Sequence, residues 1–139
     1  MKFNSQICTS KSQSERLLAL GLKKETADMC YQVKFFDPFP QHLVDCTPSL
    51  LTHPPINDER FIPAWSLHRL IEMMPQWIDT TEDSLKLIID QGKLVCYQKI
   101  ATDEVQTFIF GYRSLYDSII SVIEQLIKEG YFNKEYLEE

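Results

Sequence analysis

The chain has 139 residues, of which 44% are apolar, 12% aromatic and 24% charged. These values are typical of one globular domain with a hydrophobic core, and they exclude an intrinsically disordered chain. The formal net charge is −6 and is uneven: residues 1–63 carry seven Lys/Arg and seven Asp/Glu, whereas residues 64–139 carry seven and thirteen. Because phosphate groups are bound by clustered Lys and Arg, we expect neither direct nucleic-acid binding nor binding to an anionic membrane.

The N-terminal residues lack the apolar run of a secretory signal, and no apolar run in the chain approaches the roughly 20 residues that span a bilayer. We therefore expect a cytoplasmic protein. Its cysteines, Cys8, Cys30, Cys46 and Cys96, include no C-x-x-C pair. In a reducing compartment this pattern predicts four reduced thiols, most of them buried among apolar neighbours.

The N-terminal segment predicts two helices. The first covers residues 11–20, where Ser10 or Ser12 caps the beginning and Gly21 closes the end in a left-handed conformation. The second is a short helix over residues 24–30. Both come before any strand, so the chain is expected to begin with helical structure.

The middle of the chain changes character twice. Residues 31–35 alternate apolar and polar side chains, which predicts a half-buried strand. Residues 37–62 contain five of the seven prolines and predict an irregular segment that packs over the core, with an extended strand near Leu50. Pro63 is expected to open the next helix, because its fixed φ suits the first turn, and Pro75 is expected to end it.

The second half predicts an antiparallel sheet. Strand-like runs cover residues 85–89, 93–100 and 104–110, and turn-forming residues separate them. A long amphipathic helix then follows over residues 114–129, with a broad apolar face that suits packing on a sheet.

The ends of this last helix are also predicted. Ser114 is expected to cap its N-terminus and Gly130 its C-terminus, before an acidic tail over residues 131–139 that holds one more helical turn. The predicted fold class is α+β: N-terminal helices, an antiparallel sheet of three or more strands, and a long C-terminal helix on one sheet face. We expect a single domain over residues 1–139.

A zinc site is one candidate for chemistry. His42, Cys46 and His53, with Cys30, supply the nitrogen and sulfur ligands that zinc prefers. Their spacing lacks the paired C-x2-C that defines a zinc loop, so the alternative is a proline-rich surface loop with incidental histidines. The sequence does not decide whether His42, Cys46 and His53 converge.

Catalytic signatures are weaker still. His68 is the remaining histidine, and nothing in the sequence places it beside Cys96 for thiolate chemistry. No G-x-S-x-G elbow is present, and the paired carboxylates lie at predicted turns, where carboxylates are usually solvated. The sequence therefore specifies no catalytic residue, no cofactor and no metal ligand.

Aromatic residues at loops and element ends are the remaining lead. Phe36 and Phe39 begin the irregular segment, and Trp77 follows the proline that ends a helix. Aromatic residues at element ends anchor partner proteins in many interfaces, and in other proteins they cap a small core. We take these three residues as candidate partner contacts.

Four segments resemble short uncharacterised proteins of gut Bacteroidetes and their integrated phages. They are ERLLALGL (residues 15–22), ETADM (25–29), IPAWSL (62–67) and EGYF (129–132). The resemblance implies a small accessory protein of a mobile element, and it implies no catalytic residue.

The expected function is that of a non-catalytic, intracellular accessory or protein-interaction domain whose partner is another protein. The alternative is a small enzyme or metal-binding protein that uses residues 37–62 and His68. A third hypothesis is an accessory protein associated with nucleic acid, which the acidic second half of the chain disfavours.

Overall fold

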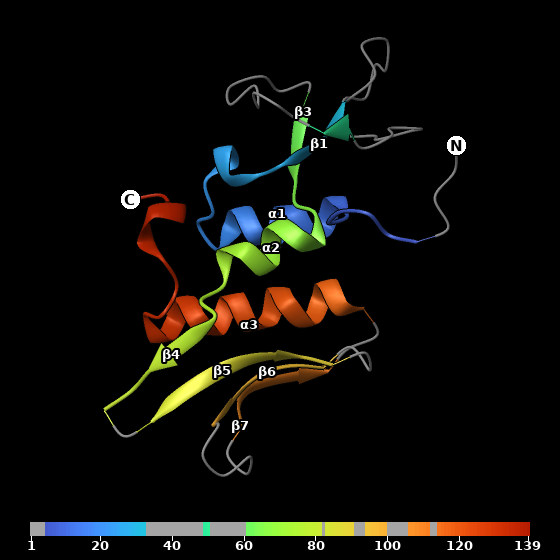
Figure 1. The fold of residues 1–139 in the computed structure, drawn as a ribbon. Helices are drawn as coiled ribbons and strands as arrows, with labels where there is room; N and C mark the ends of the chain where they lie inside the picture. Colours follow the sequence, from blue (N-terminus) through green and yellow to red (C-terminus); the bar gives the residue numbers. More distant parts are fainter. Residues whose placement is uncertain are drawn as a thin grey trace. The chain divides into compact units, whose positions relative to one another are not determined.

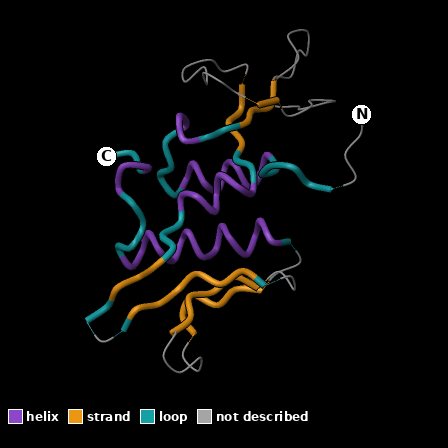
Figure 2. The backbone as a smooth tube through the Cα atoms, in the orientation of Figure 1, coloured by secondary structure: helices purple, strands orange, loops and turns teal. Residues whose placement is uncertain are grey.

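The structure is a computed structural model that describes residues 5–32, 49–50, 61–81, 83–90, 94–99, 106–111 and 114–139. Within these ranges the chain forms three α-helices, two short 3₁₀ helices and two antiparallel sheets (Figures 1 and 2). The predicted α+β class is confirmed.

The chain divides into two compact units. Residues 1–70 and 136–139 form the first, and residues 71–135 form the second. The boundary falls inside helix α2 (Leu67–Met73), and the chain returns to the first unit at its last four residues. The single domain expected over residues 1–139 stays a prediction.

Helix α1 (Lys11–Ala19) of the first unit confirms the first predicted helix. Ser10 and Gln13 form a capping box: the Gln13 N–H donates to Ser10 Oγ (3.2 Å) and the Ser10 N–H donates to Gln13 Oε1 (2.9 Å). Gly21 follows the helix with a φ of 99°, a left-handed conformation that favours glycine.

The expected helix over residues 24–30 is wrong. Only a 3₁₀ turn, η1 (Lys24–Thr26), forms there, and strand β1 (Met29–Gln32) follows. In an α-helix the Thr26 carbonyl would accept the Cys30 N–H, whereas here it accepts the Nε–H of Arg69 at 2.9 Å. A side chain far along the chain therefore takes the acceptor that a longer helix would need.

Strand β1 is the central strand of a three-stranded antiparallel sheet. Its neighbours are β2 (Ser49–Leu50) and β3 (Phe61–Ala64), in the order β2-β1-β3. The strand predicted near Leu50 is confirmed as β2. Phe36, Phe39, His42, Cys46 and His53 lie outside the described residues.

Pro63 does not open a helix, so that expectation is wrong. It lies in β3 opposite Cys30, on an edge strand of the described sheet, where a missing N–H is tolerated. Helix α2 begins later because Ser66 caps it: Ser66 Oγ accepts the Arg69 N–H at 3.1 Å, and the Ser66 N–H donates to Asp28 Oδ1 at 2.8 Å.

The C-terminal residues belong to the first unit. After the 3₁₀ turn η2 (Lys134–Tyr136), Leu137 forms an antiparallel bridge with Leu22. The Lys23 N–H donates to the Tyr136 carbonyl at 2.9 Å, and the Glu138 N–H donates to the Gly21 carbonyl at 2.7 Å. The predicted extra helical turn is η2, and the residues after it pair with the backbone that follows α1.

The second unit contains a four-stranded antiparallel sheet in the order β4-β5-β6-β7. Its strands are β4 (Trp77–Asp79), β5 (Ser84–Ile89), β6 (Leu94–Lys99) and β7 (Gln106–Gly111). The last three confirm the three predicted strands. Strand β4 was not predicted, because three residues are too few for an alternating pattern to be recognised.

Helix α3 (Leu115–Glu129) packs against β6 and β7, and Figure 1 shows it across one face of the sheet. Ser114 caps its N-terminus and Gly130 closes it with a φ of 79°, as predicted. Five side chains on its apolar face are completely buried: Ile119, Ile120, Val122, Ile123 and Leu126.

Candidate functional site

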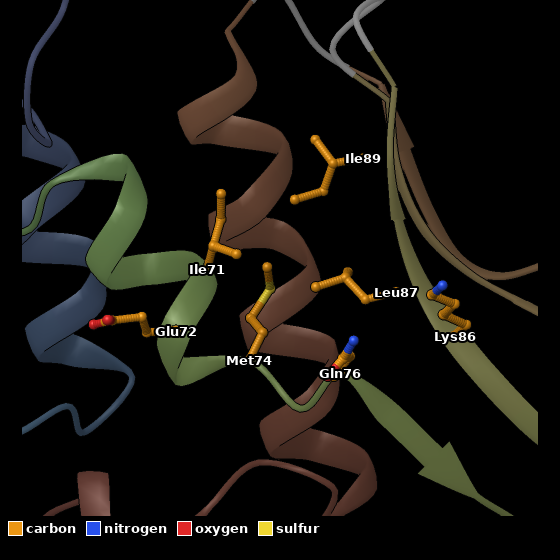
Figure 3. A pocket seen from close by; sticks show the side chains of 7 residues that line it. All are labelled: Ile71, Glu72, Met74, Gln76, Lys86, Leu87 and Ile89. Atoms are coloured by element: carbon orange, nitrogen blue, oxygen red, sulfur yellow. The ribbon is translucent and has the colours of Figure 1, made fainter.

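A pocket of about 470 Å³ lies in the second unit, between the end of α2 and strand β5 (Figure 3). Four of the side chains that line it are apolar and three are polar or charged. The lining residues are Ile71, Glu72, Met74, Gln76, Lys86, Leu87 and Ile89.

The pocket forms where the chain leaves the edge of β5. The Leu87 N–H donates to the Gln76 carbonyl at 3.0 Å, just beyond the last paired residue of β4. Two residues before Gln76, the Met74 N–H donates to the Ile71 carbonyl at 3.2 Å in the turn that ends α2, instead of pairing with β5. The chain therefore leaves β5 at Gln76, and the pocket lies beside this point.

The main chain of Ile89 faces this space. Antiparallel strands direct their main-chain groups alternately to one neighbour and the other. The Asp90 N–H donates to the Leu94 carbonyl of β6, and the Leu87 N–H donates to the opposite side. Ile89 lies two residues from Leu87, so its main-chain groups point away from β6 and toward the side on which the pocket lies.

Tyr97 holds the bend at Pro75 in place. Its side chain is completely buried, and its hydroxyl donates a 2.6 Å hydrogen bond to the Pro75 carbonyl. Burial raises the pKa of Tyr97, so the phenol stays neutral and remains a donor. The link between α2 and β4 is thus attached to a core residue of β6.

Two polar residues that line the pocket, Gln76 and Lys86, lie toward one end of it. Figure 3 shows Gln76 and Lys86 at that end, Ile71 and Ile89 at the other, and Glu72 turned away on the far side of α2. The side chains of Gln76 and Lys86 face opposite sides of the β4–β5 pair, because Lys86 lies opposite Trp77 and Gln76 is the residue next to Trp77. The apolar surface therefore ends at the Gln76 amide, and the Lys86 ammonium lies beside Trp77 on the exposed face.

Trp77 follows Gln76 in the chain and lies opposite Lys86. It is 45% exposed, and the ammonium of Lys86 lies 5.7 Å from the centroid of its ring. This distance is within the range of a cation–π interaction, which orders both side chains on the exposed face of the β4–β5 pair. Of the three aromatic residues proposed as partner contacts, the structure describes Trp77 alone, since Phe36 and Phe39 lie outside the described residues.

The other sequence candidates do not form a site in the described part of the chain. Cys30 is buried in β1, His68 is exposed on α2, and His42, Cys46 and His53 lie outside the described residues. Among the described residues, no group of three or more His, Cys, Asp or Glu is arranged to hold a metal ion.

The described thiols are buried as predicted. Cys8, Cys30 and Cys96 form no disulfide with one another, and each is at most 1% exposed. Burial raises the pKa of Cys8 and of Cys96, which disfavours the nucleophilic thiolate. Cys46 lies outside the described residues.

Buried hydroxyl groups of the first unit are occupied in structural hydrogen bonds. Thr9 Oγ1 accepts the Trp65 N–H at 3.0 Å and is 2.8 Å from Ser14 Oγ. Trp65 Nε1–H donates to Thr26 Oγ1 at 3.0 Å. These contacts connect α1 with the segment that enters α2, so the hydroxyl cluster serves the packing of this unit.

The sequence analysis did not predict the residues that line the pocket, although it singled out Trp77, the residue next to Gln76. The available signal was the pair of short runs Trp77-Ile78-Asp79 and Ser84-Leu85-Lys86 on either side of a turn. Read as a hairpin, they place Lys86 opposite Trp77 and bury Ile78 with Leu85, as the structure shows. No comparable sequence pattern indicates that the end of α2 lies close to β5.

No family model matches the chain, and neither a curated protein nor a solved structure is significantly similar to it. Within the described ranges, no helix has both the length and the apolar character needed to cross a bilayer.

Proposed function

We propose that this chain is a non-catalytic accessory protein that binds another protein through Trp77 and the adjacent pocket. The observation that carries the proposal is the position of Trp77, which is 45% exposed, lies opposite Lys86 and directly follows Gln76 of the largely apolar pocket. Exposed tryptophans next to fillable apolar pockets are typical of interface hot spots.

The surroundings of the pocket support binding in preference to catalysis. Its polar side chains are a lysine, a glutamine and a glutamate that is turned away, and they do not combine a nucleophile with a base. The buried reduced thiols support a role in the reducing cytoplasm. An accessory protein of a mobile element, as the resemblance implies, stays part of this proposal.

The test compares capture by the parent chain with capture by Trp77→Ala. The matched control is Leu50→Ala, which removes another exposed apolar side chain, 72% exposed on β2. Each folded variant is used as bait in host lysate, and the affinity of any captured partner is then measured with purified proteins. We expect Trp77→Ala to weaken binding by about 2 kcal/mol, roughly 30-fold, and Leu50→Ala to have little effect.

The proposal fails if folded Trp77→Ala, checked by circular dichroism, binds every captured partner as tightly as the parent does. It also fails if no partner is retained by the parent. An equal loss in both alanine variants would place the interface elsewhere.

A further inference from the structure

We propose that the pocket binds an extended peptide segment in which a large apolar side chain stands next to a carboxylate. This inference rests on the proposed function and names the class of partner that the same site recognises. Three properties of the pocket carry it: its apolar lining, the orientation of the β5 main chain, and the charge at its polar end.

The apolar part of the pocket has room for a large apolar side chain. Met74 is 4% exposed, and Ile71, Leu87 and Ile89 are each half-buried. Figure 3 shows Met74, which directly follows α2, and Leu87 and Ile89 of β5 directed into the same space. A leucine or phenylalanine of a partner would remove the remaining apolar surface from water at this place, which is favourable.

The main chain indicates that the partner is extended. Ile89 presents its main-chain groups toward the pocket, beyond the point at which the Leu87–Gln76 hydrogen bond ends the pairing with β4. An extended segment satisfies such groups by adding to the strand edge, and its side chains then alternate between the pocket and solvent. A helix offers no main-chain donor or acceptor from its side.

The charge at the polar end selects a carboxylate. Lys86 faces the opposite side of β5 from Leu87, so in an extended partner the residue next to the pocket-bound side chain lies on the face of the Lys86 ammonium, which is complementary to a carboxylate. The Trp77 ring lies against Lys86 at 5.7 Å and restricts its motion, which lowers the entropy lost when an acidic partner binds. The net charge of −6 favours basic partners at long range, so an acidic preference would come from Lys86 itself.

The probe is a displayed library of short random peptides, selected against the full chain and against two variants. Lys86→Glu reverses the charge at the pocket. Lys128→Glu makes the same change on α3, where the Lys128 side chain is 65% exposed and pairs with Glu124, and it serves as the control. Selected consensus peptides are synthesised and their affinities are measured by fluorescence anisotropy.

We expect the parent and Lys128→Glu to enrich peptides with a large apolar residue beside Asp or Glu. Lys86→Glu should enrich an apolar residue beside Lys or Arg, and it should bind the parent's consensus peptide at least about 10-fold more weakly. Lys128→Glu should bind that peptide within about 2-fold of the parent.

The inference is overturned if no peptide is enriched, if the enriched peptides lack an acidic residue, or if Lys86→Glu leaves the preference unchanged. These results are separable from failure of the proposed function. If Trp77→Ala loses a protein partner but Lys86→Glu keeps the peptide preference of the parent, the proposed interaction site stands and this class of ligand is rejected.

Discussion

The hydroxyl of Tyr97, a completely buried residue of β6, donates a 2.6 Å hydrogen bond to the carbonyl of Pro75 in the link between α2 and β4. A core residue thereby fixes the bend that opens the candidate pocket. Pro75 lies beyond Gln76, which accepts the last hydrogen bond from β5, and the Pro75 carbonyl accepts from a side chain instead.

Tyr97→Phe tests this relationship. Removal of the hydroxyl leaves the Pro75 carbonyl without this donor, so we expect the free energy of unfolding to fall by about 1–2 kcal/mol. Urea unfolding followed by circular dichroism gives the value. The control is Tyr131→Phe, at a position 39% exposed, which should change stability by less than about 0.5 kcal/mol. Equal effects of the two variants would contradict the assignment.

Tyr97 should also make the free energy of unfolding depend on pH in the alkaline range. Burial raises its pKa above the ordinary value of 10.0, so the folded state keeps the proton after the unfolded chain has released it. The stabilisation that the protonated Tyr97 phenol provides is fully present below about pH 10. As pH rises above this value, the free energy of unfolding falls by up to about 1.4 kcal/mol per pH unit. The stability difference between the parent and Tyr97→Phe should therefore shrink between about pH 9 and about pH 11. A constant difference would show that the phenol titrates normally.

Asp28 should contribute to stability through the start of α2. Its carboxylate accepts hydrogen bonds from both the N–H and the hydroxyl of Ser66, the residue that caps this helix. We expect Asp28→Ala to lower the free energy of unfolding by about 1–2 kcal/mol. Asp28→Asn keeps an oxygen acceptor and should lower the free energy of unfolding by less than Asp28→Ala does. Thermal unfolding ranks the two variants, and the reverse order would refute this role.

The last four residues should stabilise the first unit. Truncation after Glu135 removes two main-chain hydrogen bonds to the Gly21–Lys23 segment and the Tyr136 ring, over which Arg69 lies at 5.6 Å. We expect a loss of about 1–3 kcal/mol, and faster hydrogen exchange at the Lys23 amide. Removal of Glu139 alone is the control. Unchanged exchange at Lys23 after the longer truncation would exclude this pairing.

The buried thiols should be unreactive in the folded chain. In a Cys46→Ser background, Cys8, Cys30 and Cys96 should react with a disulfide reagent at least about 100-fold more slowly than in urea. The reason is that all three are buried, and burial raises the pKa of Cys8 and Cys96. Any one of the three that reacts at the rate of an exposed cysteine would identify an accessible thiol.

Local sequence determined the elements whose signals are short-range. Helices α1 and α3 follow from caps and from the spacing of apolar residues, as Ser10, Ser114 and Gly130 demonstrate. Strands β5, β6 and β7 follow from apolar runs separated by turn residues. In each case the deciding interactions lie within a few residues along the chain, so the sequence by itself contains them.

Tertiary contacts decided the rest. Arg69 ends the turn at Thr26, and Asp28 delays the start of α2 to Leu67, which leaves Pro63 in an edge strand. The pocket depends on Tyr97, which holds Pro75 from another strand. These interactions join residues more than twenty positions apart, and their geometry exists only after the chain has folded, so no local pattern encodes them.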